Sequence, residues 1–290
     1  MKHQQMPIFL MKKHGIDATQ HCGIFRSIEE FRQSAIRAKE LPTEEARFRR
    51  LYLNQWVNGE ISWMDMEKWN ACDEVIPIEE LIGKQCYIGV DLSTTTDLTS
   101  VNIEIRLDNG KYVMISHSFL PQNRVADKEK KDRVPYSLWI KQGYITATEG
   151  DVVDYEFIKA YIRQISTMFQ VKEICYDPWN ATQLANDLEN EGFIVVAIRQ
   201  GYITLSEPIK DLEGLILQKR IIHNNNPVLK WAISNAVIRQ DPNNNICLDK
   251  AKSRNRIDPA AAMVTSHVRA RLVENTIDLN SSILSDDFSL

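Results

Sequence analysis

Three predicted strands follow one another between residues 85 and 120, and this run constrains the fold more than any other feature. Residues 85–91 form an apolar run, and residues 98–106 and 111–120 alternate between apolar and polar side chains. The Asp-Asn-Gly sequence at 108–110 is typical of a tight hairpin turn. The chain therefore begins its sheet with three consecutive antiparallel strands.

The rest of the chain alternates between predicted helices and strands, which indicates the α/β class. Apolar runs at 171–177 and 193–198 predict a fourth and a fifth strand, and residues 246–250 predict a short additional one. The charge-rich segment 121–134 is expected to be a surface loop. Helices are expected at 136–141, 155–169, 178–191, 206–219, 227–239 and 259–273. This order predicts a ribonuclease H-like fold, a mixed five-stranded sheet with helices on both faces.

The chain divides into three predicted parts. Residues 1–80 are expected to form a helical arm that packs on the sheet-containing domain, residues 81–274. In the arm, a capping box predicts a helix over 27–40, and the segment 62–72, with its two tryptophans, predicts a short amphipathic helix. The polar tail 275–290 is expected to be disordered.

Two of the predicted strands end in an aspartate: Asp91 ends the first and Asp177 ends the fourth. In a ribonuclease H-like sheet these strands are neighbours, so both carboxylates are expected at one edge of the sheet. Asp258 stands at the start of the last predicted helix. Carboxylates on rigid elements are the hard ligands that hold two Mg²⁺ or Mn²⁺ ions about 4 Å apart for phosphodiester cleavage. The three acids therefore predict a two-metal catalytic site.

A purely structural interpretation of these aspartates stays open. Asp177 and Asp258 each precede a proline, and an Asp-Pro pair is a good helix start with the aspartate as its cap. No helix follows Asp91, and an uncompensated carboxylate at the end of a central strand is costly. Asp97 is expected to be a turn residue without a metal-binding role.

The charge of the chain is unevenly distributed. The net charge is −4, but the segment from Arg199 to Arg256 contains ten Lys or Arg residues and five Asp or Glu residues. Just before the third acid, basic residues occupy alternate positions, which share one face if the segment is extended. This row predicts contacts to a DNA backbone, with a solvated loop as the alternative. Its members are Lys250, Lys252, Arg254 and Arg256.

Neither a membrane span nor a cysteine-based site is predicted. No apolar run approaches the ~20 residues that cross a bilayer. The five cysteines are scattered and form no C-x-x-C pair, so a zinc site and a disulfide framework are both disfavoured. Buried thiols in a reducing, cytoplasmic setting are expected.

Four segments together resemble the nuclease domain of tailed-bacteriophage terminase large subunits, and the resemblance runs in order from about Ile28 to His267. Its longest motifs are "YIGVDLSTTTDLTSV", "EICYDPWNATQLANDLENEGF", "EPIKDLEGLILQKRIIHNNNPVLKWAISNAV" and "KAKSRNRIDPAAAMV". Each motif alone is weak, but the four in this order are specific.

The resemblance implies a ribonuclease H-like endonuclease that uses two Mg²⁺ or Mn²⁺ ions and cuts concatemeric double-stranded DNA during packaging. The family's three acids match Asp91, Asp177 and Asp258, and its basic approach to the third acid matches Lys252. The implied partners are double-stranded DNA, the terminase ATPase domain or small subunit, and the capsid portal. The implied location is the host cytoplasm.

The sequence departs from the family in one respect. The phosphate-binding loop of the family's ATPase, G-x-x-x-x-G-K-[ST], is not found in the chain. The chain is therefore expected to be a nuclease fragment, a split gene product or a truncated prophage remnant, with the motor supplied in trans.

Three other functions remain as alternatives. The segment "GVDLSTTTD" is similar to a phosphate loop of actin-like ATPases, but no second phosphate hairpin with Asp-x-Gly is found. A resolvase-like or transposase-like nuclease would share the acids but not the segments before Tyr87 and at 207–237. A non-enzymatic module that docks on the portal or ATPase would need no intact acids.

Overall fold

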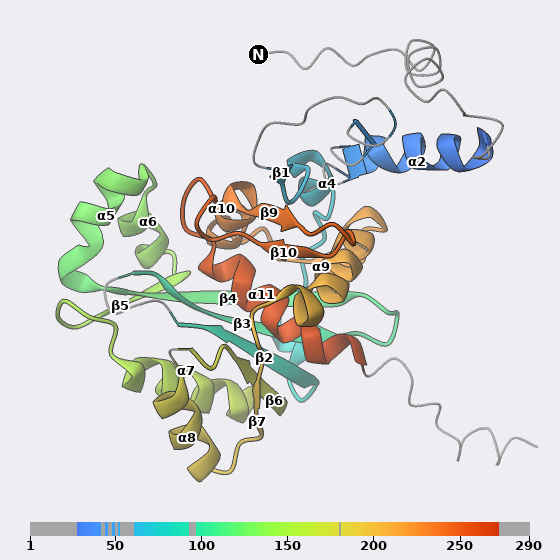
Figure 1. The fold of residues 1–290 in the computed structure, drawn as a ribbon. Coiled ribbons are helices and arrows are strands. Elements are labelled where there is room, and N and C mark those ends of the chain that lie inside the picture. The colour runs from blue at the N-terminus through green and yellow to red at the C-terminus, as the bar shows by residue number, and fades with distance from the viewer. Residues whose placement is uncertain are drawn as a thin grey trace, which may run out of the picture.

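The computed structural model describes residues 28–41, 44–45, 48–49, 52, 61–92, 97–179 and 181–272. A central sheet runs through the molecule with helices on both faces, which confirms the predicted mixed α/β architecture (Figure 1). The tail 275–290 lies outside the described residues. Among the described helices, none is both long and apolar enough to cross a bilayer.

The central sheet has seven strands in the order β5-β4-β3-β2-β6-β7, with β8 also paired to β4. Strand β3 is antiparallel to both of its neighbours, β2 and β4, whereas β6 pairs with β2 in parallel and β7 with β6 in parallel. Their bounds are β2 Gln85–Asp91, β3 Thr99–Arg106, β4 Tyr112–Pro121, β5 Ile145–Thr148, β6 Gln170–Tyr176, β7 Val195–Ala197 and β8 Ile221–Ile222.

All five predicted strands are present, as β2, β3, β4, β6 and β7, but the predicted number of five was too low. The two additional strands, β5 and β8, both pair in parallel with β4. They are four and two residues long. Segments this short carry too little alternation to distinguish a strand from a loop, so only their pairing with β4 defines them.

The helices mostly match the expected segments. Their bounds are α2 Ile28–Glu40, α4 Met66–Asn70, α5 Val125–Asp132, α6 Tyr136–Lys141, α7 Tyr155–Met168, α8 Thr182–Asn190, α9 Tyr202–Leu217, α10 Pro227–Asn235 and α11 Asp258–Ala270, with short 3₁₀ turns η1 Ile78–Leu81 and η2 Gln122–Arg124. The prediction of a loop over 121–134 was wrong, because η2 and α5 occupy it. In α5 only Val125 and Asp132 are buried, so the helix has almost no apolar stripe to reveal it.

A second, three-stranded sheet stands beside the first, with β9 (Val237–Gln240) between β1 (Ile61–Ser62) and β10 (Ile246–Leu248). The helix predicted over 227–239 therefore ends early. Ala236 adopts extended angles, and the buried β-branched Val237 and Ile238 continue as a strand. The short strand predicted over 246–250 is confirmed as β10, and the chain that leaves it leads into α11.

Helix α11 packs directly on β2 and β3 (Figure 1). The closest approach is at Gly89 in β2, where a Cβ atom would lie 2.1 Å from the Ala262 carbonyl oxygen and 2.5 Å from the Ser266 amide nitrogen. Only glycine allows the two backbones to come this near. The contact lies two residues before Asp91 and one helical turn after Asp258, so it fixes the two acid-bearing positions relative to each other.

The sheet separates two apolar cores. One lies against α7 and α8, and the other lies under α9, α10 and α11. Trp63 and Trp69, both fully buried, belong to the second core, and β1 pairs with β9. Residues 61–72 thus contribute to the packing of the sheet-containing part. The predicted boundary between residues 80 and 81 stays a prediction.

Candidate active site

Strand pairing brings the ends of β2 and β6 together. Val90 pairs with Tyr176 in the parallel register of these strands, and Asp91 and Asp177 are the next residue on each. Asp91 is buried, with 5% of its surface exposed, and Asp177 is half-buried. The two strand-end aspartates therefore lie at the same edge of the sheet.

A lysine ammonium joins Asp91 to Asp258. Lys250 Nζ donates to Asp91 Oδ1 at 2.8 Å and to Oδ2 at 2.6 Å. The same nitrogen lies 3.7 Å from Asp258 Oδ1. We call these three residues the lysine cluster. Two carboxylates that are distant in sequence thus converge on one positive charge.

Burial and charge both perturb the lysine cluster. Burial, reinforced by the negative charge of Asp91, raises the pKa of Asp258 to about 7. For Lys250, burial lowers the pKa, but the charges of Asp91 and Asp258 outweigh burial and raise it above its ordinary value. The Asp177 carboxylate contributes to the same rise. Crowded and desolvated carboxylates whose pKa values are perturbed in this way are typical of functional sites, and these two already attract one cation.

Asp177 is turned toward its own backbone. Its Oδ1 accepts a hydrogen bond from the Trp179 N–H at 3.1 Å. Among the described residues, no three His, Cys, Asp or Glu side chains converge closely enough to hold a metal ion together. The structure thus unites two of the three predicted acids and brings the third to the neighbouring strand end.

Helix capping does not explain Asp177 or Asp258. The capping position of α8 is Ala181, and that of α11 is Ile257. No side-chain hydrogen bond caps either helix. The capping interpretation that the Asp-Pro pairs suggested is therefore wrong for both residues.

The predicted row of basic residues is not extended. Asp249 Oδ1 accepts hydrogen bonds from the amides of Ala251 and Lys252, at 3.1 and 3.2 Å, and this folds the segment into a turn. The turn directs Lys250 to the acids, whereas the Lys252 side chain is exposed. The alternate spacing predicted an extended row that included Lys250 among the DNA contacts. The Asp-Lys-Ala-Lys-Ser sequence, which is typical of a turn, is the signal for the conformation that the structure has.

The remaining basic residues differ in their surroundings. The Arg256 guanidinium donates to Asp97 Oδ2 at 2.8 Å, and Lys128 of α5 forms an ion pair with the same carboxylate. Asp97 therefore links α5 to the segment before α11. In the part of the chain that the structure describes, Lys252 and Arg254 are exposed, and neither side chain forms an ion pair.

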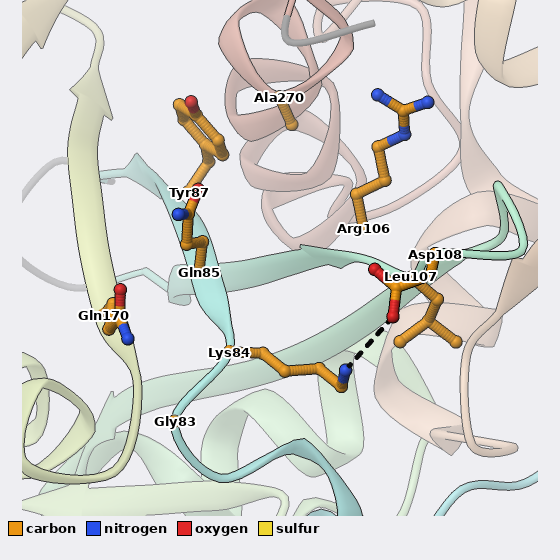
Figure 2. Close-up of a pocket in the computed structure, with 9 residues that line it drawn as sticks. All are labelled: Gly83, Lys84, Gln85, Tyr87, Arg106, Leu107, Asp108, Gln170 and Ala270. Atoms are coloured by element: carbon orange, nitrogen blue, oxygen red, sulfur yellow. Dashed lines mark ion pairs between the residues drawn. The ribbon is translucent and has the colours of Figure 1, made fainter. Parts of the chain in front are cut away.

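A separate pocket of about 500 Å³ opens at the opposite end of β2 (Figure 2). Lys84 and Arg106 are among its lining residues, and Lys84 Nζ lies 4.0 Å from Asp108 Oδ2. Figure 2 shows Tyr87 and Arg106 directed toward the α11 end that carries Ala270. None of the three predicted acids lines this pocket, so it is distinct from the lysine cluster.

The fold and the acidic strand ends define a ribonuclease H-like α/β protein. The model of one family, described as the terminase large subunit endonuclease domain, matches residues 13–274. The chain therefore belongs to the terminase large subunit family and corresponds to its endonuclease domain, which confirms the resemblance found in the sequence.

Individual relatives agree with this assignment. The terminase large subunit of Enterobacteria phage HK97 is 33% identical over 246 residues, which are 84% of this chain and 48% of that protein. Protein YmfN of Escherichia coli strain K12 is 30% identical over 249 residues, 82% of this chain and 55% of that protein. The crystal structure of the HK97 bacteriophage large terminase has a TM-score of 0.67 and 31% identity, over 89% of this chain and 53% of that chain. The chain spans about half the length of these relatives.

Proposed function

We propose that this chain is a metal-dependent endonuclease that cuts concatemeric double-stranded DNA by phosphodiester hydrolysis during phage DNA packaging. The observation that carries the proposal is the convergence of two buried carboxylates, Asp91 and Asp258, on one cation at the end of the central strand. Membership of the terminase large subunit family supports the same reaction.

The donor set fits Mg²⁺ or Mn²⁺. Asp91 and Asp258 offer hard carboxylate oxygens from two rigid elements, and the ammonium of Lys250 already demonstrates that a positive charge is stable between them. We assign metal binding to Asp91, Asp258 and Asp177; the Trp179 N–H occupies Oδ1 of Asp177, which leaves its Oδ2 for the metal. Two bound metal ions would supply an activated water and would stabilise the negative charge on the leaving oxygen.

The chain's own residues hold and direct the DNA. Lys252 and Arg254 are exposed beside the third acid and are suited to contact backbone phosphates. Lys250 is on the same turn, with 51% of its side chain exposed, and reaches the acids from the solvent side. With a metal ion bound at Asp91, the ammonium would be available to a phosphate oxygen. Arg256 is held by Asp97 and orients the turn, and we propose that it also contacts the DNA.

The partners follow from the family. The relatives are about twice as long as this chain, and we infer that a terminase ATPase supplies the packaging motor, on the same polypeptide or in trans. The terminase small subunit and the capsid portal are the other proposed partners. The proposed place of action is the host cytoplasm.

Plasmid cleavage by the purified chain tests the proposal. The reaction is run with Mg²⁺, with Mn²⁺ and with a chelator, for the wild type, Asp258→Ala and Asp127→Asn. Asp127 is an exposed carboxylate on α5 and serves as the control for charge removal away from the acids. Metal-dependent cutting that Asp258→Ala loses and Asp127→Asn keeps is the expected result. No cutting with either metal, with and without a terminase ATPase added, would favour the docking module instead.

A further inference from the structure

Trp179 is unusually exposed. It is the only aromatic residue among the large apolar side chains that are exposed in the described part of the chain, with 86% of its surface accessible. Trp63, Trp69 and Trp139 are buried. A single exposed apolar side chain needs no explanation by itself, so the place of this indole decides its meaning.

Trp179 is held beside the second acid. The backbone N–H of Trp179 donates to Asp177 Oδ1, and Pro178, whose ring fixes its φ angle, lies between the two residues. The indole thus projects into solvent from a tight turn at the end of β6. An aromatic side chain on a constrained turn binds with a small loss of conformational entropy.

The strand register places this turn between the lysine cluster and an exposed arginine. Val90, Tyr176 and Ala197 are at one level in the parallel strands β2, β6 and β7. The chain therefore leaves these strands side by side, with Trp179 after β6 and the exposed Arg199 after β7. Two strand spacings are about 10 Å, which corresponds to about three base-pair steps of DNA.

The surroundings of the indole match a nucleic acid. The cations Arg199, Lys252 and Arg254 are exposed on segments that flank the acid-bearing strand ends. Exposed aromatics interspersed with Lys and Arg are typical of nucleic-acid grooves, where the cations hold phosphates and the ring packs on a sugar or base. The charge complements a polyanion.

We propose that Trp179 contacts the DNA within about three base pairs of the cut phosphate, with Arg199 and Lys252 on the flanking phosphates. This inference rests on the proposed function, since it takes DNA to be the substrate of the acids. The indole then fixes how the duplex is seated across the strand ends, and the position of the cut depends on it.

Binding in the absence of metal tests this contact separately from catalysis. Affinity for a short duplex is measured at low salt with a chelator for the wild type, Trp179→Ala, Trp179→Phe and Ile82→Ala. Ile82 is an exposed apolar residue, 58% accessible, at the opposite end of β2 and serves as the matched control. We expect Trp179→Ala to weaken binding about thirtyfold, the middle of the range for loss of one aromatic contact, and Ile82→Ala to leave it unchanged.

Tryptophan fluorescence provides a second readout. DNA is expected to change the emission of the wild type but not of Trp179→Phe, because the other described tryptophans are buried or half-buried. A loss of affinity that is equal on paired and mismatched duplexes assigns the contact to a sugar, and a larger loss on the mismatched duplex assigns it to a base.

The inference is overturned if Trp179→Ala binds DNA as tightly as the wild type and DNA leaves the emission of Trp179 unchanged. It is also overturned if Ile82→Ala weakens binding equally. A wild type that binds DNA but cuts none with any metal would instead remove the proposed function, while the comparison of affinities would still decide on Trp179. With an active enzyme, Trp179→Ala is expected to shift the positions of the cuts on an end-labelled duplex.

Discussion

Helix α11 contributes one residue to each of two clusters in which two carboxylates surround one basic side chain. The lysine cluster is at its first residue. The second, which we call the histidine cluster, is in its last turns: His267 Nδ1 lies 2.6 Å from Glu104 Oε1, and His267 Nε2 lies 2.9 Å from Asp211 Oδ2. The histidine cluster contributes to the packing of this helix, whereas the lysine cluster lies at the candidate active site.

The two clusters differ in how closed they are. His267 and Glu104 are fully buried, and the second Glu104 oxygen accepts a hydrogen bond from Ser266 at 2.8 Å, so the cation and this carboxylate are fixed inside the core, with only Asp211 at the surface. In the lysine cluster the cation is the end of a flexible side chain, half of it exposed, on a turn. A closed cluster specifies packing, whereas an open one can exchange its cation.

The largest effect is expected from Asp91→Asn. This change removes a charged oxygen ligand but keeps the size of the side chain, so cleavage should fall by a factor of about 10³ or more, because metal ions supply several kcal/mol of transition-state stabilisation. The far-ultraviolet circular dichroism should stay as in the wild type. Cleavage near the wild-type rate would remove Asp91 from the site.

Glu104→Gln should mainly affect stability, not the chemistry. It removes one partner of a buried ion pair, and the expected loss is about 3–5 kcal/mol of the free energy of unfolding. Denaturation in urea measures this loss. Asp211→Asn is the comparison within the same cluster and should cost less, because 44% of the Asp211 side chain is exposed. Equal losses for the two variants would show that the cluster is not closed on the Glu104 side.

The histidine cluster should also make stability depend on pH. Burial alone would lower the pKa of His267, but the charges of Glu104 and Asp211 outweigh burial and raise the pKa to about 9. A raised histidine pKa stabilises the fold fully below the unfolded-state pKa of about 6.5, and this stabilisation is lost as the pH rises through about 9.

The shift in the pKa of His267 corresponds to about 3 kcal/mol of the free energy of unfolding. A comparison of the wild type with a variant that lacks the Glu104 charge isolates this contribution. The free energies of unfolding of the wild type and Glu104→Gln should differ most below pH 6.5 and should approach each other toward pH 9 and above. A difference between the two proteins that is constant with pH would mean that His267 is neutral in the fold.

The smallest effect is expected from Lys250→Met. The ammonium competes with a divalent ion for the oxygens of Asp91, so its removal should lower the half-saturating Mn²⁺ concentration by a few-fold, about 1 kcal/mol. Calorimetric titration with Mn²⁺ measures this change. Lys252→Met removes an exposed lysine two residues away and should leave Mn²⁺ affinity unchanged. Weaker Mn²⁺ binding by Lys250→Met would show that the lysine assists the metal.

Much of the sheet could be predicted from the sequence because its strands carry long apolar or alternating runs. The run ending at Asp91 predicts both a buried strand and a carboxylate at the sheet edge, and the structure has Asp91 buried at the end of β2. The approximate positions of the central strands, and the fact that they are strands, follow from the local pattern of apolar and polar residues.

The rest depends on side-chain hydrogen bonds and ion pairs, which the apolar pattern of the sequence does not encode. Helix α5 has charged residues on nearly all sides, and its ties to the molecule are distant in sequence: Lys128 forms an ion pair with Asp97, and Asn255 donates to the Asp132 carbonyl oxygen. The role of Lys250 depends on a turn made by the Asp249 side chain. That Asp177 pairs with the Trp179 N–H is likewise a local choice between two good hydrogen-bonding options.

Gly89 fixes the separation of the two buried acids of the site. Because the backbones of β2 and α11 are in contact at Gly89, Asp91 and Asp258 are held by one tightly packed unit, and their separation cannot change without disrupting the core. The cation between them, by contrast, is the end of a half-exposed lysine side chain on a separate turn. The spacing of the two buried carboxylates is therefore set by the core, and an exchange of the cation that lies between them leaves that spacing unchanged.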